Sequence, residues 1–152
     1  MDYSIEGVRR TQEKMAAKGL VGDFRQGDMH DRLPYMDASF EAIVSTQTIN
    51  HGTIEEIRKL IKEMERVLTL NGLIFITTGL GKEGSKGGRG TDKEIAPHTF
   101  VPTEGTEKGL PHYYFDREKL AKEFSNFETQ IWEEEGGKHL CLLGERKKQP
   151  EK

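Results

Sequence analysis

The most regular pattern of hydrophobic and polar positions spans residues 39–79. Two short apolar runs, at 40–44 and 73–76, have the hydrophobicity that is typical of strands buried on both faces of a sheet. Between them, apolar residues recur at intervals of three or four, which places them on one side of a helix: Ile54, Ile57, Leu60, Ile61, Met64, Val67 and Leu68. Two parallel strands joined by a crossover helix form a βαβ unit, so the pattern predicts an α/β fold with a mostly parallel sheet.

Both ends of this helix carry capping signals. Thr53 and Glu56 have the spacing of a capping box, and Asn71-Gly72 supplies left-handed residues for a tight turn before the second strand. In α/β sheets, ligands bind beyond the carboxyl ends of the strands. The sequence therefore predicts a ligand site at residues 45–51 and from Thr77 onward.

The residues before this unit contain weaker patterns. A helix is expected over residues 5–18, with Ser4 as its N-cap and Gly19 as its stop. Residues 24–27 read as a short strand, and a polar loop follows over residues 29–38. These segments predict a second helix and a third strand for the same domain.

The residues after the unit divide into an irregular and a regular part. Residues 80–112 show no sustained period, so we expect an inserted lid loop, with its second half, 100–111, partly ordered by apolar and proline residues. Asp116 is a good cap for a short helix that runs through Phe124. Residues 127–132 and 139–144 then predict two strands of an antiparallel hairpin.

Glycines in the irregular part form a G-x-G-x-x-G sequence over residues 79–84. In a dinucleotide-binding turn, a helix should follow and present its N-terminal amides to a phosphate. Residues 85–91 instead contain further glycines and no apolar stripe. We therefore interpret the run as the hinge of the lid, and rank a nucleotide-dependent oxidoreductase last among the functions considered.

Composition limits the partners. The 152 residues suit one domain, expected over 1–146 with a charged tail at 147–152, and 34% hydrophobic residues allow a modest core. A net charge of -3 with interleaved signs gives no reason to expect nucleic acid or a membrane surface, and no apolar run has the length of a spanning helix. The single cysteine, Cys141, excludes an internal disulfide framework and fits a cytoplasmic protein. His139 and Cys141 share a predicted strand far in sequence from His30, so no metal site is predicted.

Several short phrases, taken in order, resemble the landmarks of class I S-adenosylmethionine-dependent methyltransferases. None is specific alone, but the order and spacing cover nearly the whole chain, and "RVLTLNG" stands where the family usually has "RVLKPGG". Residues 98–115 look like a subgroup that acts on small molecules. The phrases are Asp2-Tyr3-Ser4, Gly27-Asp28-Met29, Leu33-Pro34, residues 39–45, Asn50-His51, and residues 65–68 with Asn71-Gly72.

This resemblance implies a Rossmann-like fold, S-adenosylmethionine as cofactor and a small-molecule methyl acceptor. It implies an acidic residue that binds the ribose hydroxyls, and an acidic residue with an apolar neighbour that contact the adenine. It also implies an uncharged turn after the fourth strand, called the elbow, beside the methionine end of the cofactor. The matching positions are Asp2 for the ribose, Asp28 and Met29 for the adenine, and Ser45, Thr46 and Gln47 for the elbow. Two vicinal hydroxyls suit the two oxygens of a carboxylate, although Asp2 at the terminus and Asp28 in a turn also have simple structural explanations.

Two histidines are the candidates for catalytic roles. His51 follows the elbow and could act as a general base or orient the acceptor, or it could only brace the loop before the helix. His112, like His98, falls in the predicted lid, where it could contact the substrate. Methyl transfer from a sulfonium needs mainly alignment, exclusion of water and, for some acceptors, removal of a proton.

The chain departs from the family at its start. The glycine-rich turn that holds the cofactor's amino-acid end, and the strand before it, would precede Asp2, and the family's strand order is 3-2-1-4-5-7-6. We therefore expect the strand at residues 40–45 to expose an edge, which favours self-association. Either the chain is part of a longer protein, or the remaining elements pair anew, among themselves or with a second copy. Without the turn, we expect weak or no cofactor binding, and a catalytically inactive interaction module is the alternative function.

Overall fold

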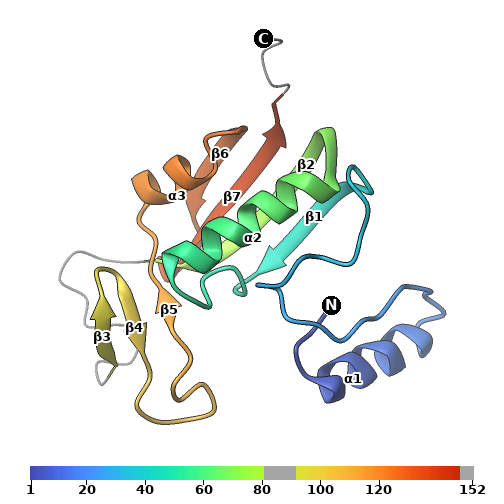
Figure 1. Cartoon of the computed structure of the whole chain (residues 1–152), viewed down its shortest axis with the longest axis horizontal. Helices are drawn as coiled ribbons and strands as arrows, with labels where there is room; N and C mark the ends of the chain where they lie inside the picture. The colour runs from blue at the N-terminus through green and yellow to red at the C-terminus, as the bar shows by residue number, and fades with distance from the viewer. Residues whose placement is uncertain (81–91, 148–152) are drawn as a thin grey trace. The chain divides into compact units, whose positions relative to one another are not determined.

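The computed structural model describes residues 1–80 and 92–147 and contains two compact units, Met1–Pro34 and Tyr35–Lys152. Residues 81–91, which include most of the predicted glycine-rich hinge, lie outside the described residues, as do residues 148–152 of the predicted tail. Figure 1 labels the elements, and each unit is treated separately below. Among the described residues, no helix combines the length and apolarity that a membrane span requires.

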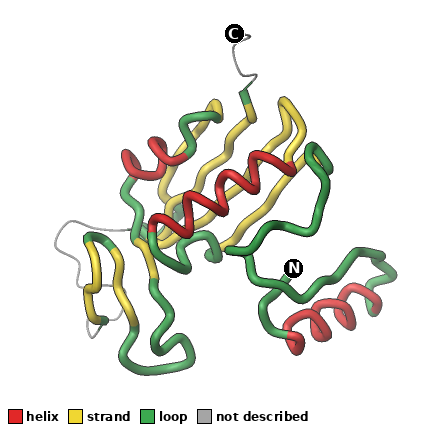
Figure 2. The backbone as a smooth tube through the Cα atoms, viewed as in Figure 1, coloured by secondary structure: helices red, strands yellow, loops and turns green. Residues whose placement is uncertain are grey.

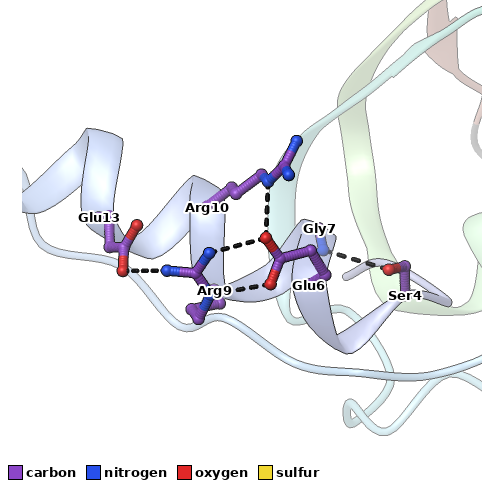
Figure 3. Close-up of polar contacts among 6 residues, drawn as sticks. All are labelled: Ser4, Glu6, Gly7, Arg9, Arg10 and Glu13. Carbon is purple, nitrogen blue, oxygen red and sulfur yellow. Dashed lines mark hydrogen bonds and ion pairs between the residues drawn. The ribbon is translucent and has the colours of Figure 1, made fainter.

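The first unit is built on α1 (Ile5–Ala16), close to the predicted helix. Its N-cap is Ser4, whose hydroxyl accepts a hydrogen bond from the backbone N–H of Gly7 at 3.3 Å, as Figure 3 shows. The helix has no buried residue, and Arg9 pairs with Glu6 on its surface at 2.7 Å. Exposed pairs of this kind contribute little individually, so capping and local pairing define α1 more than burial does.

The predicted strand at residues 24–27 is wrong. The structure contains only one parallel bridge there, between Asp2 and Gln26, with Asp2 donating to the carbonyl of Arg25 and accepting from Gly27. A strand needs a ladder of partners along its length, and the described residues provide a single bridge.

The main sheet of the second unit has the order β1-β2-β7-β6. Its strands are β1 (Phe40–Thr46), β2 (Leu68–Gly79), β6 (Phe127–Glu133) and β7 (His139–Arg146). β1 and β2 are parallel, whereas β7 pairs antiparallel with both β2 and β6. This mixed α/β fold with a C-terminal hairpin confirms the predicted class and corresponds to the 4-5-7-6 part of the expected order.

Within the described residues, β1 pairs only with β2 and forms one edge of the sheet. Neither residues 24–27 nor another described segment supplies the alternative pairing that the sequence left open. Self-association through this edge stays a prediction.

The crossover helix α2 (Ile54–Val67) lies across the face of the sheet that is turned toward the viewer in Figure 1. Its apolar stripe is buried as predicted, with Ile57 fully covered, and its capping box is formed by Thr53 and Glu56. The two ends of α2 differ in how well local sequence predicts them. The start follows from side-chain capping, but the predicted turn at Asn71-Gly72 is not the helix end.

β2 begins at Leu68, directly after α2, and Asn71 lies inside the strand with a φ of 63°. Leu68 is fully buried and pairs opposite Phe40. Because of this pairing, β2 begins three residues before Asn71, where the local sequence predicted the turn. The left-handed residue was placed correctly, and it lies where the register of β2 against β1 shifts, between the pairs Phe40–Leu68 and Ala42–Leu73.

A smaller antiparallel sheet follows, made of β3 (Lys93–Ala96), β4 (Thr99–Val101) and β5 (His112–Tyr113) in that order. The sequence predicted no regular structure for residues 92–98, and these strands of two to four residues are too short to show a period. The partial order predicted for residues 100–111 is found at its start, in β4. Figure 2 shows the long loop that connects β4 with β5.

The predicted C-terminal elements are confirmed. α3 (Arg117–Glu123) begins after Asp116, and Phe124 closes it. Phe124 is fully buried and meets Phe127 of β6 edge-on, with ring centroids 5.7 Å apart. This contact fixes α3 to the hairpin.

The N-cap of α3 gives a prediction about acid stability. Asp116 accepts a hydrogen bond from the backbone N–H of Lys119 at 2.8 Å and also pairs with its ammonium group. Burial raises the pKa of the Asp116 carboxyl, but the hydrogen bonds and charge of Lys119 outweigh burial and hold the pKa below its ordinary value. Because the folded-state pKa is lowered, this stabilisation is present above the ordinary pKa and is lost as the pH falls below about 4.

We expect Asp116→Ala to lower the free energy of unfolding by about 0.5–2 kcal/mol at pH 7, as loss of an N-cap does. Asp116→Asn keeps the cap without the charge, so it should cost less at pH 7 and reduce the loss of stability between pH 5 and pH 3. Urea unfolding at these pH values measures both effects. Equal losses for the two variants at pH 7 would contradict the capping role.

Candidate functional site

The chain turns sharply where β1 ends. Thr46 is the last residue of β1 and pairs with Thr77, and Gln47 follows with a φ of 52°. The backbone N–H of Gln47 donates to the carbonyl of Thr77 at 2.8 Å, and the Thr77 hydroxyl oxygen lies 3.1 Å away. Ser45 is buried, whereas Thr46 and Gln47 are exposed. The predicted elbow is thus present, held by the neighbouring parallel strand.

The elbow leads to a backbone contact between the two histidines that were predicted separately. His51 and His112 form an isolated antiparallel bridge. Its flanking hydrogen bonds run from Tyr113 N–H to the Asn50 carbonyl at 2.8 Å and from Gly52 N–H to the Pro111 carbonyl at 2.7 Å. Opposed residues between such bonds have their side chains close together. The two rings accordingly meet edge-on, with centroids 4.7 Å apart.

Glu107, from the loop between β4 and β5, completes the group. Its Oε2 lies 3.9 Å from Nε2 of His112, whose side chain is 8% exposed. One nitrogen of each histidine and one carboxylate oxygen all lie within 4.8 Å of one another. We call His51, Glu107 and His112 the histidine cluster.

The histidine cluster lies in a pocket of about 550 Å³ beyond the carboxyl ends of β1 and β2. Most of its side chains are polar, and Gln47 and Gly79 line it next to the two strand ends. Two buried acceptors in its wall, Asn50 Oδ1 and Asp92 Oδ1, receive no hydrogen bond from the described residues. The remaining lining residues are Leu80, Pro102, Tyr114, Gly137, Lys138 and His139. Such a pocket offers acceptors to a ligand that carries donors or positive charge.

His139, the first residue of β7, also lines the pocket. His139 pairs there with Glu134, and Cys141 is a buried free cysteine. Burial raises the pKa of the Cys141 thiol, and the charge of Glu134 adds to this effect. The thiol is therefore protonated at neutral pH and is a poor nucleophile.

Asp2, Asp28 and Met29 belong to the first unit. Oδ1 of Asp2 accepts from the backbone N–H of Ser4 at 2.8 Å, and Oδ1 of Asp28 accepts from that of His30 at 2.9 Å. The hydrogen bond from Gly27 to the carbonyl of Asp2 brings the two predicted segments side by side. Their cofactor roles stay predictions.

The structure places only some of the predicted site residues in the pocket, as the pocket lining shows. It brings His51, His112 and Gln47 together, whereas His98 lies in the turn between β3 and β4 and does not line the pocket. Glu107 was missed, because a lone acidic residue in an irregular loop carries no sequence signal. Asn50 was quoted only as a landmark, although its position beyond the end of β1 could have marked it as a site residue.

Comparison with known proteins identifies a family. A family model described as a methyltransferase domain matches residues 1–76, which is half of the chain. No curated protein matches the chain.

Solved structures share the fold at low identity. The PH0226 protein from Pyrococcus horikoshii OT3 has a TM-score of 0.73 and 16% identity, over 95% of this chain and 69% of that one. A SAM-dependent methyltransferase from Methanosarcina mazei has a TM-score of 0.72 and 18% identity, over 97% and 81%. The 1,6-didemethyltoxoflavin-N1-methyltransferase of Burkholderia thailandensis, with S-adenosylhomocysteine bound, has a TM-score of 0.64 and 10% identity, over 91% and 56%.

Proposed function

Because this chain belongs to the methyltransferase family, whose fold it shares with S-adenosylmethionine-dependent enzymes, we propose that it transfers a methyl group from S-adenosylmethionine to a small-molecule acceptor. The observation that carries the proposal is the pocket beyond the carboxyl ends of β1 and β2, lined by Gln47 and Gly79. Parallel sheets of α/β proteins bind their ligands at this edge.

The size of the pocket supports a small acceptor. A volume of about 550 Å³ falls within the range of roughly 300–1,000 Å³ that is typical of small-molecule sites. The Burkholderia enzyme is named for a small heterocyclic acceptor, 1,6-didemethyltoxoflavin, and shares the fold. The net charge of -3 also favours a small molecule over nucleic acid.

The residues at the elbow fit the cofactor in their chemistry. When bound, S-adenosylmethionine supplies a methyl group already activated by a positively charged sulfur. Ser45, Thr46 and Gln47 are neutral, and the pocket adds the buried acceptor Asn50 Oδ1, so these residues do not repel a positive charge. We propose that they orient the methionine end, and that Asp2, Asp28 and Met29 contact the adenosine.

The histidines are proposed to act on the acceptor. His51 and His112 lie side by side in the pocket, where an imidazole can orient the acceptor or take its proton. The backbone bridge between them holds the two residues opposite each other. Their task is alignment of the acceptor and exclusion of water, which is most of what methyl transfer requires.

Titration of the ¹⁵N-labelled chain with S-adenosylhomocysteine, followed by NMR, tests the cofactor assignment. Chemical-shift changes report weak as well as tight binding. Saturable shifts are expected at the amides of Asp28, Met29 and Gln47. Asp28→Asn removes a charged acceptor, so we expect binding about ten- to a hundredfold weaker.

Asp31→Asn is the matched control, because it makes the same change three residues away at an exposed position outside the predicted contacts. It should leave the shifts intact, and NAD should produce none at the same amides. An absence of shifts at millimolar S-adenosylhomocysteine would contradict the proposal and favour the inactive interaction module.

A further inference from the structure

We propose that the histidine cluster binds a divalent transition-metal ion such as Zn²⁺. Two imidazoles and one carboxylate are a ligand set that zinc uses in catalytic sites, with water in the remaining position. Here they are contributed by His51 before α2, by Glu107 in the loop between β4 and β5, and by His112 in β5. The proposal stands whether or not the chain transfers methyl groups.

Backbone hydrogen bonds position the two histidine ligands. The hydrogen bonds of Gly52 and Tyr113 on either side of the bridge hold His51 and His112 opposite each other. Little conformational freedom is then lost when both rings turn toward one ion.

The distances are close to those of a metal site. Zinc–nitrogen bonds of about 2.0–2.1 Å in tetrahedral geometry place ligand atoms roughly 3.3 Å apart. Oε2 of Glu107 is already 3.9 Å from Nε2 of His112, and all three ligand atoms lie within 4.8 Å of one another. Glu107 has a 39% exposed side chain in a loop, so rotation of this side chain can bring its carboxylate closer to His112.

A second feature of the pocket points to the same ligand. Asn50 is only 9% exposed, and its Oδ1 is buried without a hydrogen bond from the described residues. A buried acceptor left in this way costs free energy unless a bound group donates to it. Asn50 precedes His51 and lines the same pocket, so water on a bound ion is a suitable donor.

The charges are also compatible with a divalent cation. Neutral imidazoles and one carboxylate would leave the occupied site with one net positive charge. Elsewhere in the pocket lining, Lys138 adds a positive charge and Asp92 a carboxylate with a buried acceptor oxygen. Resting on the proposed function, such an ion, in place of the imidazoles that hold it, would orient an acceptor that presents an oxygen or nitrogen lone pair. Metal binding itself is tested below without cofactor or acceptor.

The test is calorimetric titration of the chelator-treated chain with ZnCl₂, together with the visible absorption of its Co²⁺ complex. We expect one ion per chain, with a dissociation constant of about 1 μM or below, and ligand-field bands that report nitrogen and oxygen ligands. Glu107→Gln, His51→Gln and His112→Gln should each weaken binding about tenfold or more, as loss of a ligand requires. Circular dichroism confirms that each variant is folded.

Two control variants separate the cluster from adventitious binding. Glu104→Gln makes the same change as Glu107→Gln in the same loop, at an exposed position, and His30→Gln removes a histidine of the first unit. Both should bind zinc like the unaltered chain. Absence of stoichiometric binding, or binding that survives Glu107→Gln and His51→Gln, would overturn the proposal. Neither outcome would affect the cofactor titration, so the two proposals fail separately.

Discussion

Phe115→Ala is expected to lower the free energy of unfolding by about 3–5 kcal/mol and to abolish zinc binding at the histidine cluster. Phe115 is fully buried, and its ring meets that of Tyr113 edge-on with centroids 4.8 Å apart. Its backbone also forms a parallel bridge with Leu80, directly after β2. The residue therefore anchors the end of β5, which carries His112, to the main sheet. Urea unfolding and zinc calorimetry measure the two effects.

Phe124→Ala is the matched control. Phe124 is equally buried and should cost a similar free energy, but its ring packs on Phe127 of β6 rather than on β5. It should keep zinc affinity under conditions in which the chain is folded. If Phe115→Ala does not fold, Phe115→Leu, with a smaller cavity, supplies the same comparison. Unchanged zinc affinity in a folded Phe115 variant would contradict the anchoring role.

Gly72→Ala is expected to lower the free energy of unfolding by about 1–3 kcal/mol, although it adds a single methyl group. A Cβ at Gly72 would lie 2.7 Å from Cγ of Leu68 and 2.9 Å from the carbonyl oxygen of Thr69. Leu68 is fully buried, and a backbone oxygen cannot rotate away, so the start of β2 would have to shift. The measurement is the midpoint of urea unfolding at constant slope.

Gly79→Ala makes the same change at the other end of β2. Its Cβ would lie 3.4 Å from Cε1 of Tyr114, which is ordinary van der Waals contact. A loss well below that of Gly72→Ala is expected. Equal losses would show that glycine matters in β2 through strand propensity alone, and not through the close approach at Leu68.

Local sequence patterns correctly predicted the helices and strands that are determined by residues close together in the chain. The Thr53–Glu56 capping box, the Asp116 cap and the apolar stripe of α2 each depend on residues within a few positions, and all are found in the structure. The hairpin of β6 and β7 was predicted for a similar reason, since a short turn-rich segment separates two apolar runs. The βαβ unit then gave the fold class, because crossover connections allow few arrangements.

Where the local sequence predicted strands incorrectly, pairing between distant segments determines which residues form strands. The start of β2 at Leu68 depends on pairing with Phe40, and β3 to β5 are too short to show a period without their neighbours. Residues 24–27 were predicted as a strand, but they form a single bridge and not a ladder of paired residues. In each case a strand is stable only when it pairs with another strand, and the local sequence does not show which segment that partner is.

The sequence by itself determined the fold class, the crossover unit and the family resemblance, and it named His51 and His112 as separate candidates. Only the tertiary structure decided that they are neighbours in one pocket. Their rings meet because hydrogen bonds from Gly52 and Tyr113 pair two distant backbone segments, and Glu107 reaches them from a loop without sequence pattern. A site of this kind is a property of chain topology, since its members share no period or motif and become neighbours only when the fold is formed.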